Sequence, residues 1–279
     1  MTFTPSADTT LIQVSPNNNA GGQEWFNSGT TQNGTLNRGL FKFDLSSIPT
    51  NAVIRSASVV LIVVHQPRDG NADAPFGLYR MLRSWGEGTN INLLNPGQGS
   101  PATAGEATWN YCFYSTNAWS APGGAIGADY SGVESSFQYV YGVGQSPYSF
   151  DSTPEMVGDV QSWVSNPQSN FGWMLLCDDE ATIFTARRFG SREDTNNAPV
   201  LQLDYLVPAR IDHAQKSGSQ FNLGFTAYPG QNYALQYRDS LSTGTWQTFS
   251  NIAPPLAPTA VTVSDPIVSA RRFYRAITY

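Results

Sequence analysis

The chain has 279 residues, which is enough for one large β domain or for two domains. Charged residues make up only 13%, about half the usual share, and Lys42 and Lys216 are the only lysines. The net charge of −6 argues against nucleic acid as a partner, and no apolar run is long enough to span a membrane.

The first long elements lie between residues 37 and 64. Phe41, Phe43 and Leu45 alternate with polar residues, which predicts a strand with one apolar face. A turn around a proline follows, and residues 53–64 are then rich in Val and Ile, which predicts a second strand. Two long strands joined by a short loop indicate an antiparallel β-sandwich.

Three long loops, residues 15–35, 90–107 and 115–132, are rich in small and polar residues. Loops longer than about 15 residues are uncommon unless they are functional or disordered. We therefore expect the sandwich to carry a decorated rim.

One helix is expected near residue 154. Ser152 and Glu155 have the spacing of a capping box, and Pro154 falls in the first turn. The apolar residues that follow share one helical face, and they are Met156, Val157, Val160, Trp163 and Val164. We expect this helix to plug one end or edge of the sandwich.

A change of pattern at Val207–Pro208 predicts two domains, residues 1–206 and residues 207–279. The second part contains short alternating strands at residues 221–225, 233–237, 246–249, 261–263 and 272–277. The predicted fold is thus all-β: a large antiparallel, jelly-roll-like sandwich with one short helix, followed by a smaller β-sandwich.

Catalytic patterns are scarce. The two histidines, His65 and His213, fall in different predicted domains, and we interpret His65 as a hydrogen-bonded structural residue. Glu87 and Glu106 flank two tryptophans and are the one pair that a sugar-cleaving enzyme could use. Framework hydrogen bonding explains these carboxylates better, so no enzymatic activity is expected.

Aromatic and arginine side chains are the candidates for ligand binding. The aromatic candidates lie in or beside polar loops, and they are Trp25, Tyr111, Tyr114 and Trp119, of which Trp119 is the best stacking platform. The cationic candidates are Arg38, Arg187, Arg188 and Arg192.

Arginine forks bind carboxylates, such as those of a uronate polymer, through two parallel hydrogen bonds. On a strand, Arg187 would share a face with Phe189 and Arg188 would point to the other face. The alternative is that these arginines pair internally with acidic residues of the chain, namely Asp8, Asp44, Glu193 and Asp194.

Two weaker features complete the search. Asp178, Asp179 and Glu180 bunch at the end of a predicted strand, where a structural calcium ion or simple solvation would each explain them. Cys112 and Cys177 are the only cysteines, and they permit one disulfide or two separate thiols.

The chain also resembles a known family. "NRGLFKFDLSSIP" with "AVIRSASVVL", the pair "RSWGEG" and "EATWN", and the late segment "FTARRFGSRED" are similar to motifs of the DNRLRE domain. The resemblance covers most of residues 1–206. It implies an extracellular β-sandwich, related to the alginate-binding carbohydrate-binding module family 96 and to a methanogen disaggregatase that acts on matrix polysaccharide. Residues 207–279 are similar to small fibronectin-like modules of exported proteins.

The first ten residues lack the basic start and apolar core of a signal peptide. Because the resemblance implies export, we expect a secreted or cell-surface protein whose leader has been removed. We expect it to bind polysaccharide, for which an acidic polymer is suited, or cell-surface matrix. One alternative is a structural subunit of an extracellular fibre or matrix held together by contacts between copies. A second alternative is a polysaccharide-degrading enzyme.

Overall fold

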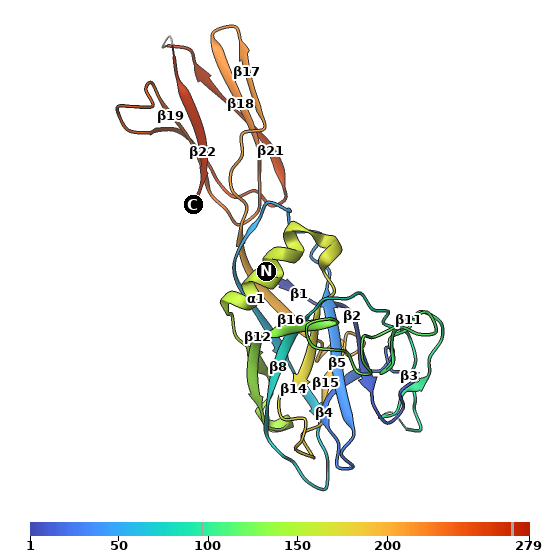
Figure 1. The fold of residues 1–279 in the computed structure, drawn as a ribbon. Helices are drawn as coiled ribbons and strands as arrows, with labels where there is room; N and C mark the ends of the chain where they lie inside the picture. The colour runs from blue at the N-terminus through green and yellow to red at the C-terminus, as the bar shows by residue number, and fades with distance from the viewer. Residues whose placement is uncertain (96, 269–270) are drawn as a thin grey trace. The chain divides into compact units, whose positions relative to one another are not determined.

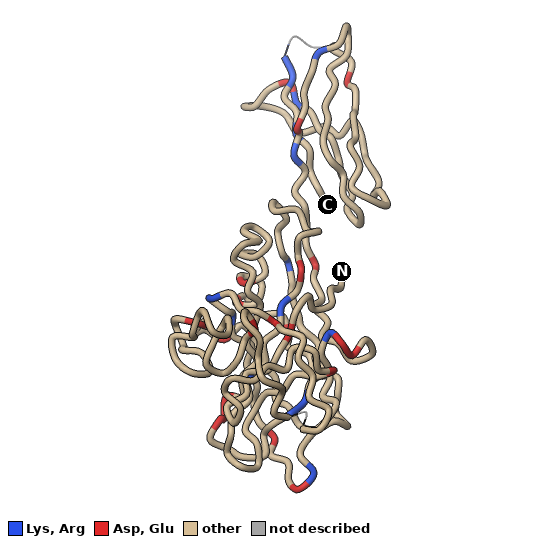
Figure 2. Tube along the Cα trace, turned by 90° about the vertical axis from the view of Figure 1, so that its right-hand side faces the viewer, with Lys and Arg blue, Asp and Glu red and all other residues tan. Residues whose placement is uncertain are grey.

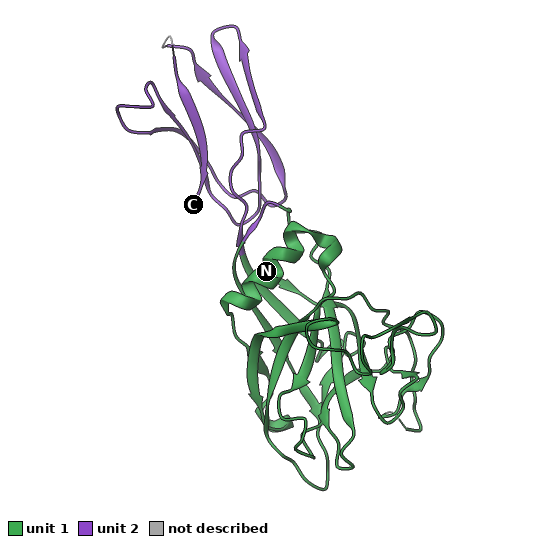
Figure 3. Ribbon diagram, in the orientation of Figure 1, with its two compact units in different colours: residues 1–50, 54–204 green, residues 51–53, 205–279 purple. Residues whose placement is uncertain are grey.

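The computed structural model describes residues 1–95, 97–268 and 271–279 (Figure 1). It confirms the predicted all-β class, because antiparallel sheets dominate and only one α-helix occurs among the described residues. The chain forms two compact units (Figure 3): unit 1 holds residues 1–50 and 54–204, and unit 2 holds residues 51–53 and 205–279. No helix in the described part of the chain is long and apolar enough to cross a membrane.

Unit 1 contains one large and one small sheet. The strands of the large sheet are β2 (Pro5–Ile12), β4 (Trp25–Thr30), β5 (Leu36–Phe43), β7 (Val63–His65), β8 (Ala74–Met81), β12 (Tyr130–Val140), β14 (Trp173–Cys177) and β15 (Arg187–Gly190). They run in the order β12–β8–β14–β5–β4–β15–β7, with β2 also beside β5.

The small sheet has the order β1–β16–β6–β13, and its strands are β1 (Thr2–Phe3), β6 (Val53–Leu61), β13 (Tyr148–Phe150) and β16 (Val200–Leu206). Two further pairs are short: β3 (Asn18–Asn19) with β9 (Ser100–Pro101), and β10 (Tyr111–Phe113) with β11 (Asn117–Ala118).

The predicted strand over residues 53–64 is in fact two strands. β6 ends at Leu61 in the small sheet, and β7 begins at Val63 in the large sheet. Between them the Ile62 carbonyl accepts a hydrogen bond from the Gly190 backbone, at the end of β15. Residues 59–64 read VVLIVV and are all apolar, so nothing in them marks the point where the chain changes sheets.

β5 shows why both faces of the large sheet are apolar. Phe41 and Phe43 are buried as the alternation predicts, and Phe41 packs 5.7 Å from Phe26 and 6.2 Å from Trp173, between ring centroids. Leu40, which points the opposite way, is also fully buried. A second layer of chain must therefore cover that face.

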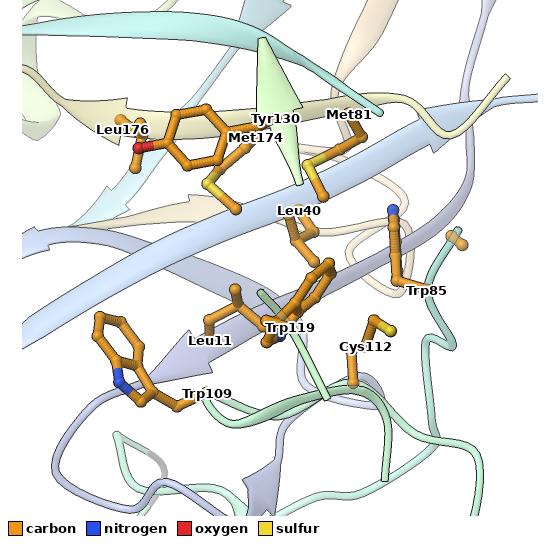
Figure 4. Packing of buried hydrophobic residues seen from close by; sticks show 12 residues of the cluster. Leu11, Leu40, Met81, Trp85, Trp109, Cys112, Trp119, Tyr130, Met174 and Leu176 are labelled. Atoms are coloured by element: carbon orange, nitrogen blue, oxygen red, sulfur yellow. The ribbon is translucent and has the colours of Figure 1, made fainter. Parts of the chain in front are cut away.

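The second layer is the loop layer, which we define as residues 82–95 and 97–129 between β8 and β12. Three of its tryptophans, Trp85, Trp109 and Trp119, pack in one cluster with Leu40 and Met81 of the sheet (Figure 4). Burying one indole removes about 150–250 Å² of surface from water, so three of them stabilise the packing of the loop layer on the sheet. These loops are folded onto the sheet, so the decoration that the loop lengths predict packs against the sandwich.

The helix α1 (Pro154–Ser165) begins one residue later than the proposed capping box implies. Its N-cap is Thr153, whose hydroxyl accepts the Met156 backbone N–H at 3.0 Å. Met156, Val160, Trp163 and Val164 are buried, as the helical pattern predicts. Trp163 packs edge-on against Trp173 of β14, with ring centroids 4.5 Å apart, so it is a core residue. Two single 3-10 turns, Val143–Gln145 and Pro167–Ser169, complete unit 1.

Unit 2 consists of two antiparallel three-stranded sheets. One has the order β17–β18–β21 and the other β20–β19–β22. Their strands are β17 (His213–Ser217), β18 (Gln220–Ala227), β19 (Tyr233–Arg238), β20 (Gln247–Ile252), β21 (Thr259–Pro266) and β22 (Phe273–Thr278). Leu223, Phe225, Tyr233 and Leu235 form the centre of its core. β17 was not predicted, because all five of its residues are exposed and it lacks an apolar face.

Candidate functional site

The candidate site of unit 1 is built on three adjacent strands, β7, β15 and β4. Arg188 of β15 lies opposite Asn27 of β4 on one side and His65 of β7 on the other. Residues directly opposite in paired strands project to the same face of a sheet. The three side chains therefore form a row across the sheet, with Arg188 in the middle.

Arg188 is a half-buried cation without a carboxylate. Its guanidinium carbon lies 4.8 Å from the centroid of the Trp25 ring. Among the described residues it makes no ion pair and no hydrogen bond, and burial lowers its pKa. A desolvated charge without a partner is costly, and a cation–π contact of about 0.5–2 kcal/mol offsets only part of that cost. The Arg188 guanidinium is thus available to bind an anion.

Arg188 lines a groove of about 310 Å³, which we call the Arg188 groove. Its lining includes the amides and hydroxyl of Asn27, Thr31, Gln32, Asn37 and Gln66, and also His65, Pro67, Arg68, Asp69, Gly97, Ala186 and Arg187. Such neutral donors and acceptors match the hydroxyl groups of a sugar. Trp25 is not part of the lining, so its ring supports Arg188 from outside the groove.

Asn37 has an unmet hydrogen-bonding capacity in this lining. Asn37 is only 6% exposed, and its Oδ1 atom is buried without a hydrogen-bond partner among the described residues. Leaving a buried polar atom unpaired costs about 1–3 kcal/mol.

His65 lies at the exposed edge of the groove. Burial lowers its pKa, and the nearby cations Arg188 and Arg68 lower it further. The imidazole is therefore neutral at pH 7 and adds no charge to the groove. No hydrogen bond holds its ring within the described part of unit 1, which corrects the interpretation of His65 as a hydrogen-bonded structural residue.

Trp119 is not an exposed platform. Its residue is 5% exposed, and its indole N–H donates to the Thr108 carbonyl at 2.9 Å inside the loop layer. The expectation of an open stacking ring is therefore wrong. Burying the ring against the sheet stabilises the loop layer more than leaving it in water would.

Arg187 is a structural residue. It is 1% exposed, and its guanidinium donates to five backbone carbonyls, those of Ala72, Tyr141, Phe184, Thr185 and Ala186. Asp73 lies 3.6 Å away and adds an ion pair. Its proposed role in ligand binding is corrected, because every part of the fork is already occupied.

Arg38 and Arg192 also pair within the chain. Arg38 makes a two-point contact with Glu180, at 2.8 Å for each bond. Arg192 bonds Glu87 at 3.1 Å and Glu193 at 3.0 Å. Both arginines therefore pair within the chain, as the alternative predicts. Of the four acidic partners first considered, Glu193 pairs with Arg192. The other side-chain partners are Glu87 and Glu180 and not Asp8, Asp44 or Asp194.

Tyr111 and Tyr114 are half-buried in the loop layer and contact each other edge-on, with centroids 5.5 Å apart. Neither lines the Arg188 groove. Of the eight proposed ligand-binding residues, Arg187 and Arg188 line the groove, and Trp25 contacts Arg188 from outside it.

The acidic run at residues 178–180 is divided among separate partners. Asp178 accepts the Tyr79 hydroxyl at 2.7 Å, Asp179 accepts the Thr182 hydroxyl, and Glu180 holds Arg38. Within the described ranges, no group of three or more His, Cys, Asp or Glu side chains is placed to hold a metal ion. The structure thus lends no support to the proposed calcium site.

Cys112 and Cys177 are separate, buried thiols. Cys112 lies in the loop layer on β10 and Cys177 ends β14, and burial raises the pKa of both. The disulfide alternative is therefore corrected in favour of two free thiols.

Comparison with known proteins adds no assignment. A scan against protein-family models finds no match to the chain, and a search of curated proteins finds no significant match. The site therefore has to be interpreted from its own chemistry. Sequence reasoning missed Asn27 and Asn37, because isolated amides within strands carry no distinctive pattern. It also missed Arg68, a single cation outside the strands. The nearest signal was Trp25, which stands in the same strand as Asn27.

Proposed function

We propose that this protein is an extracellular, non-catalytic protein that binds polysaccharide at the Arg188 groove of unit 1. The observation that carries the proposal is the unpartnered guanidinium of Arg188, held against Trp25 at a groove lined by amides. A saccharide supplies hydroxyl groups to the amides, and a sugar acid supplies a carboxylate to the guanidinium. We therefore expect an acidic polysaccharide as the preferred ligand.

The groove would recognise its ligand by charge and hydrogen bonds more than by stacking. No tryptophan, tyrosine or phenylalanine is found in its described lining. Neutral glucans, which bind chiefly through stacking of the pyranose face on aromatic rings, would gain little here. The proposal therefore predicts that acidic saccharides bind more tightly than neutral glucans, and this difference in affinity can be tested.

A framework role for the carboxylate pair supports the non-catalytic part of the proposal. Glu106 accepts the Asn90 amide and the Thr103 backbone N–H, and Glu87 holds Arg192 together with the Asp8 backbone N–H. Glycoside hydrolysis needs one carboxylate to donate a proton and another to act as base or nucleophile beside the sugar. Neither residue lines the Arg188 groove.

The test is titration calorimetry of the full chain with short oligosaccharides of a uronic acid and with neutral glucan oligosaccharides of the same length. The wild type should bind the uronate and not the glucan. Arg188→Gln should lose about tenfold or more in affinity, since a charged hydrogen bond is worth about 1.5–3 kcal/mol. The matched control is Arg55→Gln, which removes the same charge from an exposed position on β6.

Equal losses in Arg188→Gln and Arg55→Gln would show that only net charge matters. Unchanged affinity in Arg188→Gln would remove this groove as the binding site. Binding of the neutral glucan as tightly as the uronate would contradict the acidic preference.

A further inference from the structure

A second cluster of unpaired cations lies in unit 2, on the sheet β20–β19–β22. The guanidinium carbons of Arg238 and Arg275 lie 4.8 and 4.4 Å from the centroid of one ring, that of Trp246. Arg238 ends β19, Arg275 lies in the adjacent β22, and Trp246 immediately precedes β20. Three neighbouring strands thus bring two positive charges to a single indole.

Neither arginine has a carboxylate partner among the described residues of unit 2. Arg275 donates to the Gln236 side chain at 2.8 Å, and Arg238 donates to the Leu241 carbonyl at 2.7 Å. The Arg238 Nε atom is buried and without a partner. Both guanidinium groups therefore keep donors that an oxyanion could use.

The acids of unit 2 are already paired with other arginines. Asp265 and Asp239 lie 2.6 and 3.3 Å from Arg272, and Asp212 lies 3.8 Å from Arg210. None of these three acids forms an ion pair with Arg238 or Arg275, so we look for the anion of the Arg238–Trp246–Arg275 cluster outside unit 2.

The charges of the two units are opposite in sign. Residues 205–279 contain six Lys and Arg but three Asp and Glu, a net charge of +3, whereas residues 1–204 contain nine and eighteen, a net charge of −9. Figure 2 marks these residues along the chain. Surfaces of opposite charge attract each other and favour a complementary partner over a like-charged one.

We propose that the Arg238–Trp246–Arg275 cluster is a carboxylate-binding site through which unit 2 of one molecule binds the acidic unit 1 of a second copy. The Trp246 ring carries two guanidinium groups and so acts as a support for charge, which suits a carboxylate side chain better than a sugar ring. Unit 1, with its net charge of −9, is present in every copy. Because the contact joins two different surfaces, it repeats head to tail and builds rings or open chains of molecules.

This inference does not rest on the proposed saccharide groove, since it uses no residue of unit 1 near Arg188. It is tested by sedimentation velocity of the full chain over a range of concentrations at low salt and at about 1 M salt, where the screening length falls to about 3 Å. The wild type should form species larger than the 30.3 kDa monomer at low salt and dissociate at high salt.

The double variant Arg238→Gln with Arg275→Gln should weaken association about tenfold, as expected for the loss of two partly exposed ion pairs. The matched control is Arg210→Gln with Lys216→Gln, which removes two charges from the same unit at exposed positions. Its association should stay close to that of the wild type. Arg188→Gln should also associate normally.

Three results would overturn the inference. The first is a wild type that stays monomeric at every concentration at low salt. The second is an equal loss of association in both double variants, which would assign the effect to net charge and not to the cluster. The third is unchanged association in the Arg238→Gln, Arg275→Gln variant together with lost binding of a uronate polymer, which would make the cluster a glycan site.

Discussion

Arg187 and Arg188 are adjacent in the chain, yet replacing each with methionine should affect stability very differently. Arg187→Met removes five hydrogen bonds from a buried guanidinium to backbone carbonyls and the ion pair to Asp73. Breaking a buried charged network in this way costs about 3–5 kcal/mol. For a unit of about 200 residues, each kcal/mol lowers Tm by about 2–4 °C, so a fall of about 6–20 °C is expected.

Arg188→Met removes a cation that has no carboxylate partner among the described residues. The change loses a cation–π contact of about 0.5–2 kcal/mol to Trp25 but also removes the cost of a desolvated charge. Methionine keeps most of the apolar stem, so the free energy of unfolding should change by no more than about 1 kcal/mol. The same variant should lose uronate binding.

Thermal unfolding followed by tryptophan fluorescence is a suitable assay. Six of the seven tryptophans lie in residues 1–204, so the signal reports chiefly on unit 1. Arg55→Met serves as the control for an exposed arginine. If Arg188→Met lowers Tm as much as Arg187→Met, then Arg188 is a structural residue and the argument for a binding site at the groove fails.

Two further predictions concern the buried residues of unit 1. Trp119→Ala should lower the free energy of unfolding by about 3–5 kcal/mol and leave saccharide affinity unchanged. Melting curves check the stability and calorimetry checks the affinity. A stable variant that has lost affinity would restore the role of Trp119 as a stacking platform. Asp8→Asn should stabilise the protein at pH 7, because burial raises the Asp8 pKa well above 3.8 and penalises the charged form. Wild-type stability should therefore increase as pH falls from the raised pKa towards 3.8, and the gap between the two proteins in denaturant unfolding should close over that range; a constant gap would contradict this reasoning.

The sequence by itself determined the class of fold and much of its local structure. Alternation at Phe41 and Phe43 predicted the burial of β5, and the helical spacing of Met156, Val160 and Trp163 predicted the inner face of α1. These patterns succeed because a residue's neighbours along the chain decide which face it occupies in a strand or helix. Alternation also predicted that Arg187 and Arg188 project to opposite faces of their strand.

Tertiary structure alone decided which polar and aromatic side chains are free. Arg187 is occupied by carbonyls as distant in sequence as Ala72, and Arg192 by Glu87, whereas Arg188 meets no carboxylate in the described structure. Trp119 stands in a polar loop by its sequence, yet the loop layer folds it into the core. Hydrogen bonds and burial depend on distances of a few ångströms between remote segments, and the local pattern of the chain contains no record of those distances.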